Sequence, residues 1–279
     1  MAVDRYLKLS SPATREFWEI PVLWEDEALL ALDKPAPLLT SPHREDPARP
    51  SLMELLHAAI GRGVPWARER QLTYLALAHR LDFETTGVQL LARSKPALIA
   101  LANQFGCGQA ARTYLALVHG TPAEDGFEVE APLAPDPVHP GAVRVNRRQG
   151  KAAASRFTVR ERFTGYTWLQ CELRTERTHQ IRVHLRHVGL TLVGDALYGG
   201  PPLRLSQLKS GYRLKPHRTE RPLLSRVALH AAGLSVPHPL TGQPTEITAP
   251  LPKDLTVALG YLRRYALAPG PSPLSPGGG

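Results

Sequence analysis

Residues 79–87 read HRLDFETTG, and they separate two apolar segments, 74–78 (YLALA) and 87–92 (GVQLLA). Both apolar segments are predicted strands, and the hydroxyl-rich stretch between them is a predicted turn that ends at a glycine. Rigid scaffolds often present catalytic groups on loops that leave strand ends, which makes Asp82 a candidate catalytic carboxylate. Aspartates also cap their own turns, and this stretch taken alone favours that simpler role.

A second polar stretch, RTHQIRVHL at residues 177–185, opens a predicted helix whose apolar positions fall on one face. Its first turns concentrate the polar residues Arg177, His179, Gln180 and Arg182. A basic solvated face is one interpretation. Metal binding by His179 and His184 is disfavoured, because ligands five residues apart do not share a helical face. We therefore expect no metal site.

The remaining pattern indicates the fold class. Further strands are predicted at 28–33, 114–118, 156–163, 166–173, 229–236 and 245–249, and helices begin at Ser51 and Ser94, the second ending near Gly106. Ser51 and Glu54 have the spacing of a capping box. Because strands outnumber long helices and do not alternate with them, we predict an α+β protein with a large mixed or antiparallel sheet.

Charge is unevenly distributed along the chain, which has a formal net charge of +9. Residues 16–54 hold nine acids against three bases, whereas the basic segments 144–162 and 204–226 each hold seven bases against one acid. Segregated positive charge of this kind is typical of phosphate-binding surfaces, so we expect an RNA or DNA partner.

The chain has no apolar stretch of membrane-spanning length and no apolar core of an export signal near its start. It has two cysteines, for which reduced thiols are the simplest interpretation. We expect a cytoplasmic protein with no membrane partner.

Six short motifs in register resemble one enzyme family. HRLDFETTG is similar to the HRLDxxTSG signature of the RluA-like RNA pseudouridine synthases, and RTHQIRVHL resembles that family's third motif. The other four are Asp33-Lys34-Pro35, residues 112–120 (RTYLALVHG), residues 194–199 (GDALYG) and the LHA…HP element from Leu229. The resemblance spans roughly residues 25–254.

The resemblance implies the pseudouridine synthase fold, a large, mostly antiparallel mixed sheet flanked by helices. It also implies an isomerase that breaks the C1′–N1 bond of uridine, rotates the base and rejoins it through C5. That chemistry needs no cofactor. By resemblance Asp82 is the essential carboxylate, Arg182 is its ion-pair partner, and Tyr114 stacks on the uracil ring or takes the C5 proton.

RNA contacts are expected around these residues. The target base must be flipped out of its stack, and Arg80 is placed by resemblance to fill the vacated space. The other expected RNA-binding residues are His79, Arg177, His179, Gln180, Arg147, Arg148, Lys209, Arg213 and Lys215. Ribosomal RNA is the first expected substrate and transfer RNA the second.

The expected organisation is an N-terminal extension (1–24), a catalytic domain (25–264) and a disordered Pro/Gly-rich tail (265–279), without an S4 domain and as a monomer. Phe83, Thr86, Glu176 and Pro37 depart from the family pattern. The main alternative is a catalytically silent RNA-binding protein of the same fold. An RNA glycosidase or nuclease is a weaker one, with Glu84 as the nearby second carboxylate.

Overall fold

The computed structural model describes residues 5–43, 46–214 and 217–267. Its strands are β1 (Tyr6–Ser11), β2 (Glu16–Glu25), β3 (Leu29–Lys34), β4 (Ala76–Leu77), β5 (Thr86–Ala92), β6 (Ala111–His119), β7 (Gly126–Glu130), β8 (Leu133–Pro135), β9 (Val143–Val145), β10 (Ala154–Phe163), β11 (Tyr166–Leu173), β12 (Leu229–Pro237) and β13 (Pro244–Thr248). Its helices are α1 (Leu52–Gly61), α2 (Pro65–Glu69), α3 (Lys95–Gly106), α4 (Gln180–His187), the 3-10 turn η1 (Ala196–Tyr198), α5 (Leu205–Leu208) and α6 (Lys253–Tyr265).

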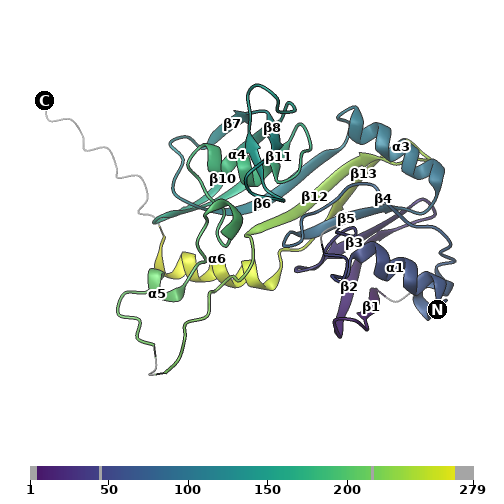
Figure 1. Ribbon diagram of the computed structural model, residues 1–279, viewed down its shortest axis with the longest axis horizontal. Helices are drawn as coiled ribbons and strands as arrows, with labels where there is room; N and C mark the ends of the chain where they lie inside the picture. The colour runs from purple at the N-terminus through teal and green to yellow at the C-terminus, as the bar shows by residue number, and fades with distance from the viewer. Residues whose placement is uncertain (1–4, 44–45, 215–216, 268–279) are drawn as a thin grey trace, which may run out of the picture.

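One eleven-stranded sheet forms the centre of the molecule (Figure 1). Its order is β1-β2-β3-β5-β12-β6-β11-β10-β7, with β13 paired to β12 and β4 to β5, while β8 and β9 form a separate ribbon. The pairing of β12 with β5 is parallel, and the other strand pairs of the described residues are antiparallel. This confirms the predicted α+β class with a mixed, mostly antiparallel sheet.

Alternation along the strands divides the core between the two faces of the sheet. In β3, Leu30 and Leu32 pack with α1, while Leu29 and Ala31 pack with α3 on the other side. In the other half of the sheet, α4 packs over β6 and β11, and α6 covers the opposite face. Leu91 and Ala231 belong to the α1 and α4 clusters respectively, and the pairing of Ala231 with Gly87 places them on the same face. The α1 and α4 clusters therefore lie side by side on one face, with β5 and β12 beneath their junction.

Most predicted elements are present. The capping box of α1 is formed, since the Ser51 hydroxyl accepts the Glu54 N–H and the Glu54 carboxylate accepts the Ser51 N–H. Helix α3 ends at Gly106 as expected. The strand predicted over 74–78 is shorter than expected, because only Ala76–Leu77 pairs with β5.

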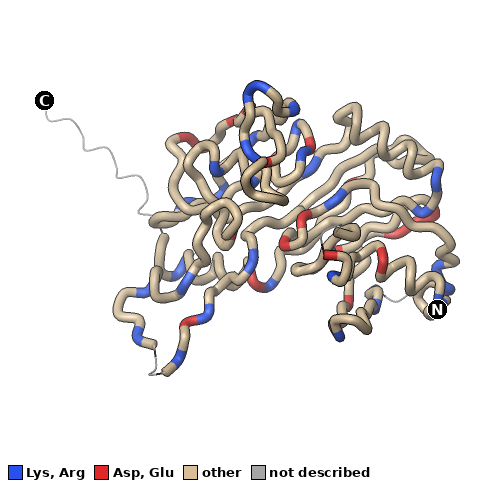
Figure 2. The backbone as a smooth tube through the Cα atoms, in the orientation of Figure 1, with Lys and Arg blue, Asp and Glu red and all other residues tan. Residues whose placement is uncertain are grey.

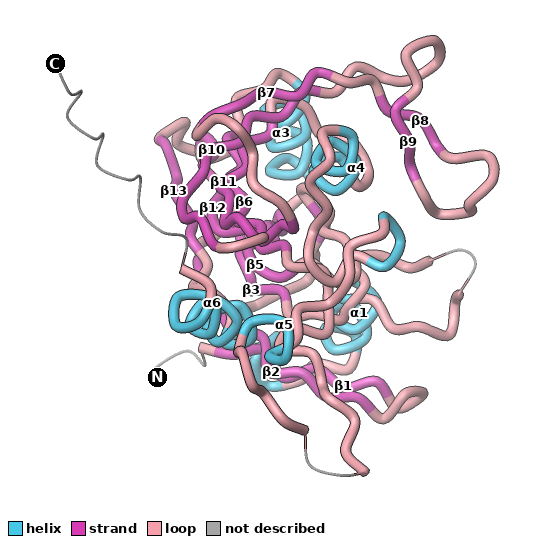
Figure 3. The backbone as a smooth tube through the Cα atoms, turned by 90° about the vertical axis from the view of Figure 1, so that its left-hand side faces the viewer, coloured by secondary structure: helices cyan, strands magenta, loops and turns pink. Residues whose placement is uncertain are grey.

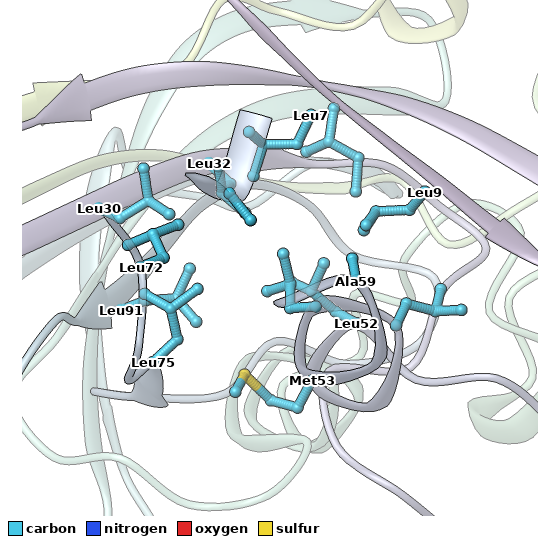
Figure 4. Packing of buried hydrophobic residues seen from close by; sticks show 14 of the residues in the cluster. Leu7, Leu9, Leu30, Leu32, Leu52, Met53, Ala59, Leu72, Leu75 and Leu91 are labelled. Atoms are coloured by element: carbon cyan, nitrogen blue, oxygen red, sulfur yellow. The ribbon is translucent and has the colours of Figure 1, made fainter. Parts of the chain in front are cut away.

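Strands β1 and β2 and helix α6 were not anticipated. β1 and β2 form an antiparallel hairpin that continues the sheet through β3. Leu7 and Leu9 of β1 are buried against α1 (Figure 4). Strand β2 thus runs across the boundary expected between residues 24 and 25, and the N-terminal segment is an edge hairpin of the catalytic sheet.

Basic segment 204–226 leaves the body of the protein beyond α5 and returns toward β12 (Figures 1 and 3). Lys and Arg residues are spread along it (Figure 2). The tail from residue 268 onward, including most of the segment expected to be disordered, lies outside the described residues. Among the residues that the structure describes, no helix has the length and apolar character needed to cross a membrane.

Candidate active site

The loop between β4 and β5 carries Asp82, and buried groups from distant segments fix its backbone. Thr40 Oγ1 donates to the Leu81 carbonyl at 2.6 Å, and the Leu81 N–H donates back to the same hydroxyl. The Phe83 carbonyl accepts from Leu38 N at 3.0 Å and from Lys34 Nζ at 3.4 Å. The turn itself is closed by Thr85 N donating to the Asp82 carbonyl. Because the backbone closes the turn, the Asp82 side chain is left to face another element.

Lys34 is a fully buried cation beneath this loop. Its ammonium group also donates to the carbonyls of Pro35 at 2.9 Å and Leu38 at 2.7 Å, so all three donors have acceptors. Burial lowers the pKa of Lys34 to about 7, and the charge of Asp82 opposes this shift. Lys34 therefore ties β3 to the loop that presents Asp82.

Gly87 lets β5 approach β12 closely at the end of the loop. Its φ is +110°, and a Cβ at this position would collide with the backbone carbonyl of Ala231. Only glycine tolerates both conditions. The glycine that closes HRLDFETTG is therefore required by the parallel pairing of β5 and β12.

The Asp82 carboxylate contacts Arg182 of α4, one hundred residues later in the chain. Arg182 Nη1 donates to Asp82 Oδ2 at 3.2 Å. The other edge of the guanidinium is held by Asp195, which accepts from Nε and Nη2 at 2.8 Å each. Burial of Arg182 opposes its charge, but the bonds to Asp195 and Asp82 prevail and raise its pKa. Arg182 is thus a permanent cation aimed at Asp82.

His179 and Tyr198 form the next layer of the site. His179 Nε2 lies 3.8 Å from Asp82 Oδ2, and His179 Nδ1 is 2.8 Å from the Tyr198 hydroxyl. That hydroxyl also accepts the Val143 N–H at 2.9 Å, so Tyr198 connects His179 to the backbone of β9. Burial lowers the pKa of His179, and the Arg182 charge adds to this, so the ring is neutral at pH 7.

Tyr114 lies on β6 within the α4 cluster and is 6% exposed. Burial raises the pKa of its phenol, and the Glu176 carboxylate adds to this effect. Glu176 is held by an ion pair with the buried Arg112. The phenol is therefore fully protonated at neutral pH.

Asp82, His179 and Arg182 meet at a cleft of about 1410 Å³ over the junction of the α1 and α4 clusters, whereas Tyr114 is buried behind it and does not line it. Asp82, Glu84, His179 and Arg182 line it, together with Arg80 and Arg177, both exposed. Its opposite wall includes Gln149 and Lys151, which follow the exposed Arg147 and Arg148 in the chain. The structure therefore brings Asp82, Arg182, Arg80, Arg177 and His179 together at one opening.

Two expected RNA-binding residues are largely buried, although His79 also lines the cleft. The Gln180 side chain is bonded to Thr175, the Ala154 carbonyl and Ser155. His79 Nε2 accepts the Leu90 N–H at 3.1 Å, and burial lowers the pKa of this histidine to about 3. Both are less than a tenth exposed. These side chains position the flanks of α4 and of the Asp82 loop, and their contact with RNA stays a prediction.

The expected contacts in segment 204–226 lie away from the cleft. Lys209 is exposed, with Nζ 5.8 Å from the Tyr265 ring centroid, and Arg213 is also exposed. Lys215 lies outside the described residues. Within the described part of the segment, none of these side chains lines the cleft that holds Asp82.

Comparison with known proteins identifies the family. The family model described as RNA pseudouridylate synthase matches residues 28–187, more than half of the chain. A ribosomal large subunit pseudouridine synthase D of Xanthomonas campestris is 36% identical over 266 residues, covering 94% of this chain and 75% of that protein. Its namesake from Pseudomonas aeruginosa is 35% identical, covering 88% of this chain and 72% of its own length. The chain belongs to the RNA pseudouridylate synthase family.

The solved structure of human RNA pseudouridylate synthase domain containing 4 shares the fold of this pseudouridine synthase. The two superpose with a TM-score of 0.64 at 22% identity, covering 89% of this chain and 94% of that chain. Family membership also makes the protein an isomerase, as the motifs predict. The family-level resemblance is thereby confirmed.

The synthase contains site residues that sequence analysis did not single out. Asp195 lies within the GDALYG motif, and Lys34 within Asp33-Lys34-Pro35, so their motifs were noticed but their contacts were not. Arg226 donates to the Glu84 carbonyl at 3.2 Å, and no local pattern marks it. Among the described residues, no group of three His, Cys, Asp or Glu side chains is arranged to hold a metal ion.

Proposed function

We propose that this synthase isomerises uridine in large-subunit ribosomal RNA, with Asp82 as the essential carboxylate. The ion pair between Asp82 and Arg182 carries the proposal, because it joins the two polar motifs at the wall of a cleft large enough for a nucleotide. The names of the relatives that cover most of the chain support ribosomal RNA as the substrate. Transfer RNA is the second candidate.

The reaction needs one negatively charged oxygen beside the nucleoside. The C1′–N1 bond breaks, the base turns, C1′ bonds to C5, and the proton on C5 leaves while N1 gains one. A carboxylate at Asp82 can attack C1′, add to the base or remove a sugar proton. Each route requires a negative charge on Asp82, and the buried cation Arg182 stabilises it. No step needs a cofactor or an external oxidant.

Tyr114 and Arg80 have separate proposed roles. Tyr114 is buried on β6, near enough for the Asp82 charge to contribute to the raised pKa of its phenol, and we propose that its ring supports the flat base and its phenol handles the C5 proton. Arg80 is exposed at the cleft and precedes Asp82 by two residues, so it can occupy the space that the flipped uridine leaves. Arg177, Arg147 and Arg148 bind phosphates around the opening, and the neutral His179 lies with its Nε2 beside Asp82.

We also propose the division of the chain. Residues 25–264 form the catalytic domain, and the hairpin from β1 to β2 is attached to its edge. The monomeric state and the cytoplasmic location are parts of the same proposal. Sedimentation of the purified chain would test the monomer.

Release of tritium from uracil C5 tests the function. Large-subunit ribosomal RNA and transfer RNA, each transcribed with tritium at uracil C5, would be incubated with wild type, Asp82→Asn and the control Asp125→Asn. Asp125 is an exposed carboxylate paired with Arg162 at 2.8 Å, outside the cleft. We expect release with ribosomal RNA by wild type and the control, and none by Asp82→Asn. Release by Asp82→Asn would refute the role of Asp82. Binding without release by any variant would favour the silent RNA-binding protein.

A further inference from the structure

A second, smaller pocket opens beside the catalytic cleft. It has a volume of about 380 Å³, and Asp46, Arg49 and Phe83 line both it and the cleft. Its far wall is Trp18 of β2, in the hairpin that lies outside the matched family segment 28–187. Because Phe83 directly follows Asp82, this opening adjoins the proposed catalytic carboxylate.

The pocket walls are aromatic and firmly held. Arg49 lies over the Phe83 ring, with its guanidinium carbon 4.7 Å from the ring centroid. The Phe83 backbone is held by Leu38 and Lys34. Trp18 packs on the core that joins the hairpin to α1, in which Leu7 and Leu9 lie over the helix (Figure 4). The pocket is thus preformed, which reduces the entropy cost of binding a flat ring.

The charge of the pocket excludes a phosphate as its occupant. Among the described residues that line it, the charged ones are Glu16, Asp46 and Arg49, which sum to −1. The positive charge of Arg49 is already paired with the Asp46 carboxylate, because Arg49 Nε donates to Asp46 Oδ2 at 3.0 Å. A phosphate would meet two carboxylates and one neutralised arginine. An uncharged aromatic ring meets no such penalty, and Phe83, Trp18 and the Arg49 plane are surfaces on which bases stack.

We infer that this pocket receives an unstacked nucleobase of the substrate RNA that flanks the target uridine, held by Phe83 and Trp18. The inference rests on the proposed function, since that function supplies the RNA. Carboxylates only accept hydrogen bonds, so Glu16 and Asp46 favour a base with an exocyclic amino group, such as adenine or cytosine.

Binding of single strands by the full chain tests the pocket. Fluorescence anisotropy would compare an oligoadenylate of about ten nucleotides with an abasic ribose-phosphate strand of equal length. The variants are Phe83→Leu, Trp18→Leu and Phe83→Tyr, which keeps the ring. Trp24→Leu is the matched control, because Trp24 lies on the same strand, β2, but lines neither cavity. Circular dichroism melting would verify that each variant is folded.

Wild type should prefer the oligoadenylate by about 10-fold, the effect expected for one stacked base. Phe83→Leu and Trp18→Leu should each abolish most of this preference without altering its salt dependence, while Phe83→Tyr and Trp24→Leu should retain it. An equal preference in wild type and in folded Phe83→Leu would overturn the inference, as would an absence of preference in wild type. Tritium release separates the two proposals. If wild type releases tritium but Phe83→Leu still prefers the oligoadenylate, only the pocket inference is refuted. If Phe83→Leu loses the preference but wild type releases no tritium, only the proposed isomerase function is refuted.

Discussion

Asp195 accepts two hydrogen bonds of 2.8 Å from Arg182, one on each carboxylate oxygen. These bonds occupy Nε and Nη2, so that Nη1 is the nitrogen that reaches Asp82. Asp195 is itself 1% exposed, and as the N-cap of η1 its side chain accepts the Tyr198 N–H. The direction of the Arg182 charge is therefore set by a residue that does not contact Asp82.

Asp195→Asn should lower kcat without preventing RNA binding. An amide offers one acceptor oxygen instead of two, so Arg182 loses one of its two hydrogen bonds to residue 195. The guanidinium is then no longer held in the orientation that points Nη1 toward Asp82. We expect kcat to fall by about 10- to 100-fold, which is about 1.4 to 2.7 kcal/mol of transition-state stabilisation. Single-turnover tritium release measures this, with Asp125→Asn as the matched control. An unchanged kcat together with a lower melting temperature would show that Asp195 serves only stability.

Arg182→Lys should lower kcat strongly even though the substitution retains the positive charge. A lysine ammonium is a point charge and does not reproduce the planar fork with which Arg182 bonds Asp82 and both oxygens of Asp195. We expect a loss of about 100-fold in kcat, the scale found when one well-aimed donor is removed from an active site. Arg186→Lys, one turn further along α4 and exposed, is the control. Equal activity of the two variants would contradict the need for a fork-shaped cation.

The regular elements were largely predictable because their signals are local. The capping box at Ser51 and the continuous apolar runs of β5 and β6 are readable within ten residues. Helix α6 was missed although Leu255, Leu259 and Leu262 follow a helical spacing. β1 offers only Leu7 and Leu9 as an alternating signal. Such a short edge strand is specified mainly by its packing on α1, which a local pattern does not contain.

The site was predictable only through the resemblance. Asp82 alone favoured a turn cap, and nothing local joins it to Arg182 one hundred residues away. The resemblance of the six motifs to the family implied that Asp82 and Arg182 form an ion pair. The contacts of Lys34, Thr40 and Arg226 depend on how three loops fold over one another. The burial of His79 and Gln180 likewise depends on tertiary packing, which a local pattern does not contain.

Tyr198→Phe should weaken both the fold and the position of His179. It removes the acceptor of the Val143 N–H and the hydrogen-bond partner of His179 Nδ1, while keeping the ring 4.9 Å from the Arg182 guanidinium carbon. We expect the free energy of unfolding to fall by about 1 to 3 kcal/mol, the cost of leaving a buried polar group unpaired. Urea denaturation measures it. Tyr166→Phe, in which a buried ring packs on His119, is the control and should change stability less.

Stability should fall at acid pH because of His79. Burial lowers its folded-state pKa to about 3, while the unfolded chain binds the proton near the ordinary histidine pKa of 6.5. Between these values the unfolded state binds more protons, so stability decreases as the pH falls from about 6.5. Protonation would also remove the acceptor of the Leu90 N–H. His79→Gln keeps an acceptor without titrating, and it should reduce the loss between pH 7 and pH 5 by about 2 kcal/mol. Equal pH dependence of wild type and variant in urea denaturation would exclude His79 as the source.

Basic segment 204–226 should bind RNA outside the catalytic cleft. Arg213, Arg218 and Arg221 are exposed on an excursion that does not line the cleft (Figure 2). Replacing all three with glutamate should weaken RNA binding and reduce the slope of log affinity against log salt by about 0.7 to 0.9 for each phosphate that the segment no longer neutralises. The first-order rate at saturating RNA should stay unchanged, because no catalytic group is touched. Filter binding at several salt concentrations measures the slope. In the control variant, glutamate replaces three arginines that are paired with neighbouring side chains, namely Arg160, Arg174 and Arg263. A wild-type slope in the 204–226 variant would mean that the segment does not contact the RNA backbone.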